Sequence, residues 1–150
     1  MPPIEREAIL PRMDGIARNI KKLKELAMLP LAEFSTGDAY DLAQHHLRMA
    51  LEGVFHIGAH ILSRLPGARS KEYREIGQEL GETGVVPQEF ADRALVPMAK
   101  MRNLLVHQYA DLDPKRMYDV CKNHLQDIEQ YLGYISDLMS DPGRLGLGVE

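Results

Sequence analysis

The chain has a single cysteine, no tryptophan and no long uninterrupted apolar run. Because Cys121 has no partner within the chain, a framework of internal disulfides is excluded. The most apolar segment, residues 51–65, still carries four charged or ionisable side chains, so we expect no membrane-spanning helix. The N-terminal residues also lack the apolar run of a secretory signal peptide. Together these absences predict a cytoplasmic protein.

The sequence shows neither a strong excess of one charge nor a boundary between domains. The 18 basic and 22 acidic side chains give a net charge of −4, which argues against broad nonspecific binding of nucleic acid but not against a local basic site. A chain of 150 residues with 45% apolar side chains is long enough for one ordinary core. No glycine-rich phosphate loop, internal repeat or interdomain linker is present. We expect one domain over residues 1–140 and a flexible tail at residues 141–150.

The apolar residues recur at steps of three and four, which is the spacing of one helical face. No run alternates convincingly with period two, as a half-exposed strand would. The pattern therefore predicts an all-α fold, an up-and-down bundle of four to five main helices. The expected helices cover about residues 9–27, 40–65, 70–80, 87–105 and 114–139.

Two prolines refine these boundaries. Pro97 lies inside the fourth helical pattern, where it predicts a kink or short break near Val96. Asp113 followed by Pro114 is typical of a helix start, with a capping carboxylate and proline at the first helical position.

Arg102 and His107 lie in a stretch from Arg93 to Ala110 that contains three basic residues and no acid. The pair suits a phosphodiester, because a guanidinium binds non-bridging oxygens and an imidazole can move protons at the 2′-hydroxyl and the leaving oxygen. No acidic cluster lies nearby to hold magnesium. Catalysis at this pair would therefore be metal-independent RNA cleavage with the 2′-hydroxyl as internal nucleophile. Alternatively, both side chains could interact with the last carbonyls and the dipole of their helix.

The five-residue spacing of this pair poses a geometric difficulty. On a regular helix each residue turns by about 100°, so Arg102 and His107 point roughly 140° apart. They can converge if the helix loosens just after Val106, before the new start at Asp113. A twofold axis beside the helix would also bring two copies of the pair to one cleft.

Residues 102–109, RNLLVHQY, fit an Arg-x4-His-x-Tyr signature with Asn directly after the Arg. This segment resembles the HepT-like toxins of the HEPN superfamily. Three further segments are similar to helices of that family in the same order, so the resemblance covers about residues 5–139. These segments are LRMALEGVFHIGAHIL, LGETGVVPQEFADRALVPMAKMRN and DLDPKRMYDV.

The resemblance implies a helical homodimer that acts as a ribonuclease and is encoded beside an MntA-like minimal nucleotidyltransferase antitoxin. It implies that Arg102 and His107 form the active site and that Asn103 has a supporting polar role. It further implies that the antitoxin transfers AMP to the hydroxyl of Tyr109 and thereby silences the toxin. No metal or cofactor is expected.

Glu52, His56 and His60 form a second candidate cluster, because their spacing of four residues places them on one helical face. Two histidines at this spacing can bind zinc. A further ligand from a distant element is not identifiable, and isoleucines run alongside. We therefore favour a partly buried polar seam or a subunit contact over a metal site.

Two functions from different classes remain open. The first is an RNA endonuclease toxin regulated by a nucleotidyltransferase, which rests on Arg102 and His107. The second is a helical module that pairs with the nucleotidyltransferase and binds RNA or nucleotide without cutting. The acidic net charge and the divergence of the pair on a regular helix favour the second.

Overall fold

A computed structural model describes residues 2–67 and 72–150, except for the side chain of Tyr109. Over these residues the chain is helical, and the only extended pairing among them is a bridge between Ile4 and Val149. The all-α prediction is confirmed. No helix in the described ranges is long and apolar enough to cross a membrane. The elements are α1 (Arg6–Leu26), α2 (Leu31–Phe34), α3 (Asp38–Leu62), α4 (Tyr73–Glu82), α5 (Gln88–Phe90), the π-helix η1 (Ala91–Leu95), α6 (Val96–His107), the 3-10 helix η2 (Tyr109–Asp111), α7 (Pro114–Asn123), α8 (Leu125–Ser140) and the 3-10 helix η3 (Pro142–Leu145).

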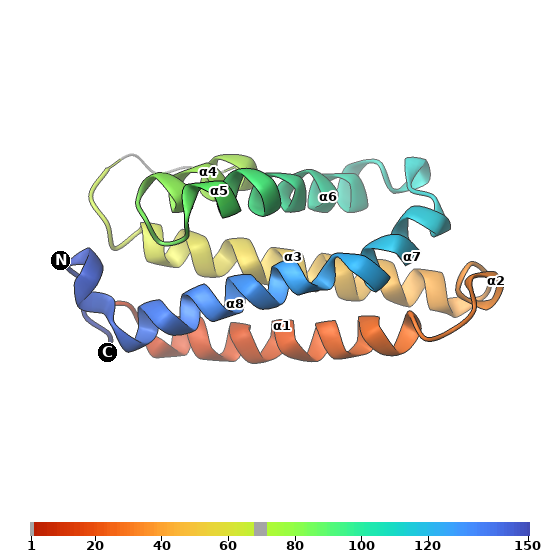
Figure 1. Cartoon of the computed structure of the whole chain (residues 1–150), viewed down its shortest axis with the longest axis horizontal. Coiled ribbons are helices and arrows are strands. Elements are labelled where there is room, and N and C mark those ends of the chain that lie inside the picture. The colour runs from red at the N-terminus through yellow and green to blue at the C-terminus, as the bar shows by residue number, and fades with distance from the viewer. Residues whose placement is uncertain (1, 68–71) are drawn as a thin grey trace.

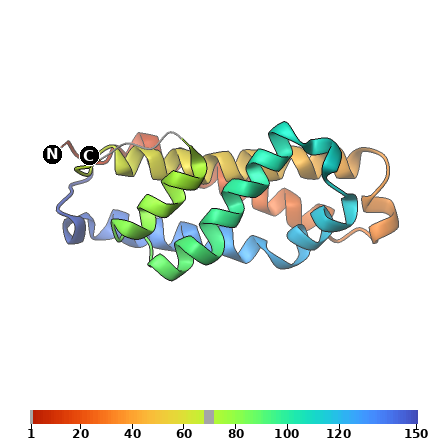
Figure 2. The same ribbon diagram turned by 90° about the horizontal axis from the view of Figure 1, so that it is seen from above.

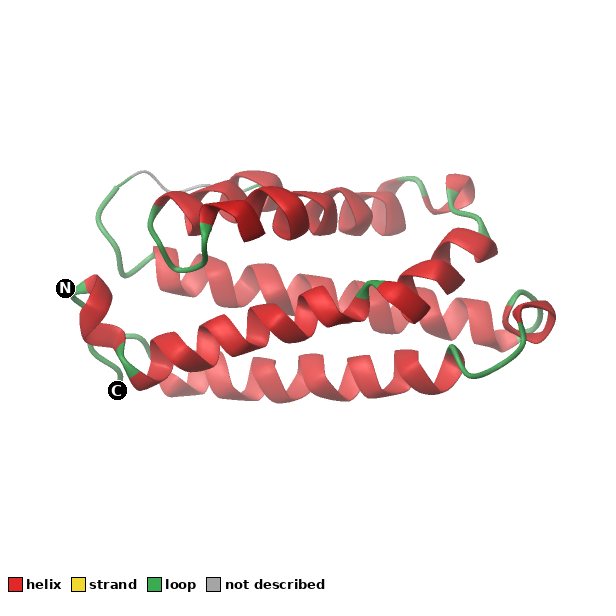
Figure 3. Cartoon of the chain, in the orientation of Figure 1, coloured by secondary structure: helices red, strands yellow, loops and turns green. Residues whose placement is uncertain are grey.

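The long helices run alternately up and down the bundle (Figure 1). Helices α1 and α3 pack along each other, and α4 and α6 both contact α3. Seen from above, the segment from α4 to α6 forms one layer over the rest (Figure 2). Loops connect the helices at both ends of the bundle (Figure 3). The start of α4 and the end of α6 therefore belong to the same layer, on one side of α3.

Aromatic side chains fill the core between these helices. Phe34, Phe55, Phe90 and Tyr131 are fully buried. The Tyr131 hydroxyl donates a hydrogen bond of 2.8 Å to the Val54 carbonyl, so its burial leaves no polar atom unpaired. Burial also raises the pKa of Tyr131. This contact fixes α8 against α3.

The predicted break near Val96 is confirmed, and it takes the form of the π-helix η1. Pro97 has no N–H to donate, and its ring crowds the carbonyl four residues earlier. The Val96 N–H bonds to the Ala91 carbonyl, five residues back, which is the π-helical pattern. Val96 itself has helical backbone angles (φ −62°, ψ −47°), and α6 begins there.

The prediction of one helix over residues 114–139 is wrong, because His124 interrupts it with φ −121° and ψ 0°. The predicted start is confirmed: the Asp113 carboxylate accepts hydrogen bonds from the N–H groups of Lys115 (2.7 Å) and Arg116 (3.1 Å). Helix α7 contacts the segment after α1, where the Tyr118 hydroxyl donates a hydrogen bond of 2.6 Å to the Leu29 carbonyl. Apolar spacing continues across the interruption and does not reveal it.

Residues 141–150, expected to be a flexible tail, instead pack on the bundle. Leu147 is buried. The Ile4 N–H bonds to the Gly148 carbonyl and the Glu150 N–H to the Ile4 carbonyl, both at 2.8 Å. Arg144 donates to the Gly84 carbonyl at 2.8 Å. The prediction failed because the partners of this segment lie at the other end of the chain and in the loop after α4.

Candidate active site

The candidate site lies where α6 ends. Helix α6 stops at His107 because Gln108 leaves the helical region, with φ −136° and ψ 33°. The Gln108 N–H still bonds to the Leu104 carbonyl at 3.0 Å. The 3-10 helix η2 begins at the next residue. The predicted loosening just after Val106 is not seen, because α6 stays helical through His107 and ends one residue later than expected.

An open pocket of about 650 Å³ brings the two predicted residues together. Arg102, Asn103 and His107 line it from α6, and Tyr73 and Arg74 line it from the first turn of α4. Glu72 and Gln108 complete the lining. Both side chains therefore line one pocket within a single chain, although α6 is helical from Arg102 to His107.

The guanidinium of Arg102 is held by neighbours on several sides, although its side chain is 21% exposed. Its Nη2 lies 3.2 Å from Glu52 Oε2, and its Nε lies 3.4 Å from the same oxygen. Its Nη1 donates to Asn103 Oδ1 at 3.4 Å, and its Cζ lies 4.5 Å from the centre of the Tyr73 ring. Arg102 is therefore engaged with protein groups, not with the end of its own helix.

The cluster on α3 is an intramolecular polar seam. Glu52 contacts Arg102, the His56 Nε2 lies 3.1 Å from the Tyr73 hydroxyl, and the His60 Nε2 accepts the Glu5 N–H at 3.1 Å. The three side chains thus contact three different parts of the chain: α6, α4 and the residue before α1. In the described part of the chain, no group of three or more histidine, cysteine or carboxylate side chains could hold a metal ion. The zinc alternative therefore has no support here.

The two histidines of this seam favour their neutral forms. Burial lowers the pKa of His56 most, and the nearby Arg12 lowers it further. Burial likewise lowers the pKa of His60, followed by the charge of Arg64. Glu52 and Glu5 act in the opposite direction but do not prevail.

The acid-free stretch in sequence is not acid-free in space. Arg93 forms ion pairs with Glu89 at 2.9 Å and Asp127 at 3.0 Å. Arg102 pairs with Glu52 of α3. Carboxylates from other turns and helices therefore balance two of the three basic side chains of this stretch.

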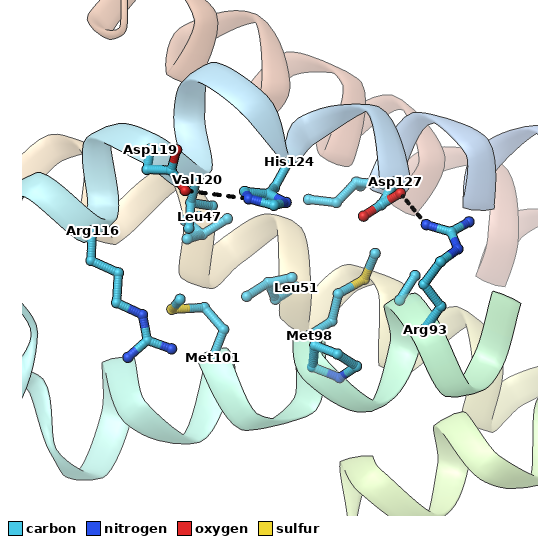
Figure 4. A pocket seen from close by; sticks show the side chains of 13 residues that line it. Leu47, Leu51, Arg93, Met98, Met101, Arg116, Asp119, Val120, His124 and Asp127 are labelled. Carbon is cyan, nitrogen blue, oxygen red and sulfur yellow. Dashed lines mark hydrogen bonds and ion pairs between the residues drawn. The ribbon is translucent and has the colours of Figure 1, made fainter.

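A second pocket, of about 380 Å³, lies on another face of α6 (Figure 4). Leu47, Met98 and Met101 give it an apolar lining. The ion pair between Arg93 and Asp127 lies at this pocket, and Asp119 Oδ2 lies 3.3 Å from His124 Nε2. The pocket contains neither Arg102 nor His107, so it suits a phosphodiester less well than the pocket at the end of α6.

Sequence reasoning missed the contribution of α4. Glu72, Tyr73 and Arg74 are not separable by spacing or composition from the other polar residues of their segment.

For the predicted AMP acceptor, the backbone places Tyr109 at the start of η2, next to the pocket-lining Gln108. Its side chain lies outside the described part, and its modification stays a prediction.

A family model described as "Ribonuclease HepT-like" matches residues 16–135. The chain belongs to the HepT-like family. This HepT-like protein is 28% identical over 140 residues to a protein named tRNA nuclease HepT from Aphanizomenon flos-aquae, a match that covers 93% of this chain and 95% of the relative. The resemblance seen in residues 102–109 is thus confirmed at the level of the family.

Solved structures show the same fold. One is a tri-AMPylated HEPN toxin of Shewanella oneidensis in complex with an MNT antitoxin, with TM-score 0.77 and 24% identity over 88% of this HepT-like chain and 98% of that chain. Another is a toxin–antitoxin with AMP-PNP, with TM-score 0.74 and 22% identity over 87% and 98% of the two chains. YutE of Bacillus subtilis, described as a cytosolic protein of unknown function, has TM-score 0.60 and 20% identity over 87% and 92%. At these identities the likeness shows the HEPN fold alone.

Proposed function

We propose that this chain is an RNA endonuclease toxin that cleaves without a metal ion, with Arg102 and His107 as its catalytic residues. The observation that carries the proposal is the single pocket lined by both side chains at the end of α6. The family supports it, because the relative from Aphanizomenon flos-aquae is named a tRNA nuclease. RNA is accordingly the proposed substrate, and the cytoplasm the proposed location.

The pocket supplies two of the functions that such cleavage needs, charge stabilisation and removal of a proton. Arg102 binds the non-bridging oxygens of the phosphodiester and offsets the charge that develops on them. The imidazole of His107, exposed at the pocket, takes the proton of the 2′-hydroxyl. The 2′-oxygen then attacks phosphorus and the bond to the 5′-oxygen breaks, which leaves a 2′,3′-cyclic phosphate and a 5′-hydroxyl once that oxygen is protonated.

A homodimer fits this chemistry. One imidazole cannot at the same moment remove a proton on one side of the phosphorus and deliver another on the opposite side. A second copy of the site, related by a twofold axis, would supply the second imidazole.

Asn103 has a supporting role, since it contacts Nη1 of Arg102 and lines the pocket.

Regulation by an MntA-like nucleotidyltransferase is the second part of the proposal. The HEPN toxin of Shewanella oneidensis is described as tri-AMPylated and in complex with an MNT antitoxin. AMP on the Tyr109 hydroxyl would place a bulky anion two residues from His107, where the substrate phosphate should bind. Steric occlusion and charge repulsion would then act together.

Cleavage in the presence of a chelator tests the first part. The wild-type protein should degrade total RNA in EDTA, and His107→Ala should reduce the rate by about 100-fold or more because a proton-transfer group is lost. His45→Ala, at an exposed position of α3, is the matched control and should cleave normally. Unchanged cleavage by His107→Ala would contradict the assignment. RNA binding without products would favour the non-catalytic module.

Intact mass spectrometry tests the second part. The chain coexpressed with a nucleotidyltransferase encoded beside it should gain whole AMP units that map to Tyr109. Tyr109→Phe removes the acceptor oxygen and should stay unmodified while still cleaving RNA. AMP found on Tyr109→Phe, or on another residue of the wild type, would refute this acceptor.

A further inference from the structure

Arg102 is the pocket residue whose position is defined by contacts from three elements. Glu52 comes from α3, Tyr73 from α4 and Asn103 from α6 itself. Glu52 and Tyr73 are distant from Arg102 in the sequence, and neither belongs to the Arg-x4-His-x-Tyr signature. Their contacts determine which edge of the guanidinium is left for a substrate.

The carboxylate occupies one edge of the guanidinium only. Both Nε (3.4 Å) and Nη2 (3.2 Å) of Arg102 approach the single oxygen Oε2 of Glu52. The second edge lies between Nη1 and Nη2, each of which carries two N–H groups, and one N–H of Nη1 is donated to Asn103 Oδ1 at 3.4 Å. A phosphate can therefore bind bidentately at this second edge while Glu52 keeps the first.

The Tyr73 ring forms a fixed support beneath the guanidinium. It stacks on Phe55, with ring centres 4.8 Å apart and planes 14° apart, and Arg102 lies over it at 4.5 Å. The Tyr73 hydroxyl is in turn within 3.1 Å of the His56 Nε2. The ring therefore cannot shift without breaking contacts to α3.

The contact between Glu52 and Arg102 is better shielded than a surface ion pair. The two side chains are 15% and 21% exposed. Shielding strengthens the attraction, and loss of one partner leaves the other incompletely compensated. Glu52 also lies 3.4 Å from Arg48, but the Arg48 side chain is 47% exposed. Of the two contacts of Glu52, we therefore expect the one with Arg102 to restrict the motion of a guanidinium.

We infer that Glu52 and Tyr73 are positioning residues that hold the Arg102 guanidinium in a fixed orientation toward the scissile phosphate, with His56 steadying the Tyr73 ring. This inference rests on the proposed RNA cleavage. It assigns the seam on α3 to the site: Glu52 and His56 form a layer behind Arg102 and do not themselves touch the substrate.

Kinetics of RNA cleavage provide one test. Glu52→Gln removes the charge but keeps the size, and kcat should fall by about 10- to 100-fold with a smaller change in KM, as expected when a reacting group is misplaced. Tyr73→Leu should act in the same direction. Tyr73→Phe retains the ring and loses only the hydroxyl, so its effect should be smaller. Glu52→Asp should recover part of the activity that Glu52→Gln loses.

Two matched controls separate positioning from general loss of an ion pair. Asp127→Asn breaks a pair with Arg93 away from the pocket, and Arg48→Gln removes the other partner of Glu52. Both should cleave at the wild-type rate. Thermal unfolding of every variant identifies any that fails to fold, and Glu52→Gln, with its conserved volume, is the variant on which the conclusion depends.

A second readout does not require cleavage. The ¹⁵Nε–¹H NMR signal of Arg102, assigned by its loss in Arg102→Lys, should shift and broaden in Glu52→Gln and Tyr73→Leu but not in Asp127→Asn. An unchanged signal in Glu52→Gln would overturn the positioning role. So would wild-type or faster cleavage by that variant. If the wild type itself cuts no RNA in EDTA, the proposed function fails while the NMR comparison still tests whether Glu52 and Tyr73 fix Arg102.

Discussion

His60 shows how single side chains of the seam on α3 depend on their protonation state. Its Nε2 accepts the backbone N–H of Glu5 at 3.1 Å, which requires a neutral ring with a lone pair on that nitrogen. Burial, and then the charge of Arg64, lowers its pKa in the folded protein. Protonation of this ring therefore opposes the contact between α3 and the segment before α1.

Stability should consequently depend on pH at this residue. Because the folded pKa of His60 lies below its unfolded value, the stabilisation is fully present above about pH 6.5 and is lost as pH falls through the range between the two values. Urea unfolding at about pH 7.5 and about pH 5 measures the loss. His60→Gln keeps an acceptor without a titrating ring, so its free energy of unfolding should change less between these pH values. An equal pH dependence in variant and wild type would refute this assignment.

At the scale of elements, two glycines let α4 approach η1 closely enough to bring Tyr73 to the site. A Cβ placed at Gly81 would lie 2.7 Å from Ala91 Cβ, and one at Gly77 would lie 3.2 Å from Leu95 Cβ. The first distance is shorter than carbon atoms tolerate, and Ala91 has no rotamer through which to move away. The glycines on this face of α4 are therefore a packing requirement.

Gly81→Ala should destabilise the protein by about 1–3 kcal/mol, because the added methyl forces α4 away from η1. Gly133→Ala is the matched control in α8, where a Cβ meets nothing within 4 Å. There alanine should stabilise by about 0.5–1 kcal/mol through its higher helix propensity. Chemical denaturation of both variants provides the comparison. A Gly81→Ala protein as stable as the wild type would show that α4 and η1 are not closely packed.

Local sequence signals predicted the elements that depend on local physics. Apolar spacing predicted the long helices, Asp113 and Pro114 predicted the start of α7, and Pro97 predicted the disturbance at η1. The interruption at His124 was missed because apolar spacing continues through it. The hydrogen bond of Tyr118 to Leu29, 89 positions away, is likewise not encoded in any local pattern.

At the scale of the whole molecule, the up-and-down bundle assembles the site from distant segments (Figure 1). The pattern RNLLVHQY identified Arg102, Asn103 and His107, and the structure places all three at one pocket. The residues that contact Arg102 from other helices were not predictable. Glu52 lies 50 positions from Arg102, and its spacing to His56 and His60 suggested a polar seam or a metal site instead. The packing of the last residues against Ile4 was missed for the same reason.

The proposed cleavage proceeds without a metal ion, by attack of the 2′-hydroxyl at the pocket of Arg102 and His107. The most direct measurement is analysis of the ends of RNA fragments produced in EDTA by the wild type and by His107→Ala. The wild type should give 2′,3′-cyclic phosphate and 5′-hydroxyl ends, and the variant should give no such fragments. Fragments with 3′-hydroxyl and 5′-phosphate ends, or cleavage only when magnesium is restored, would contradict it.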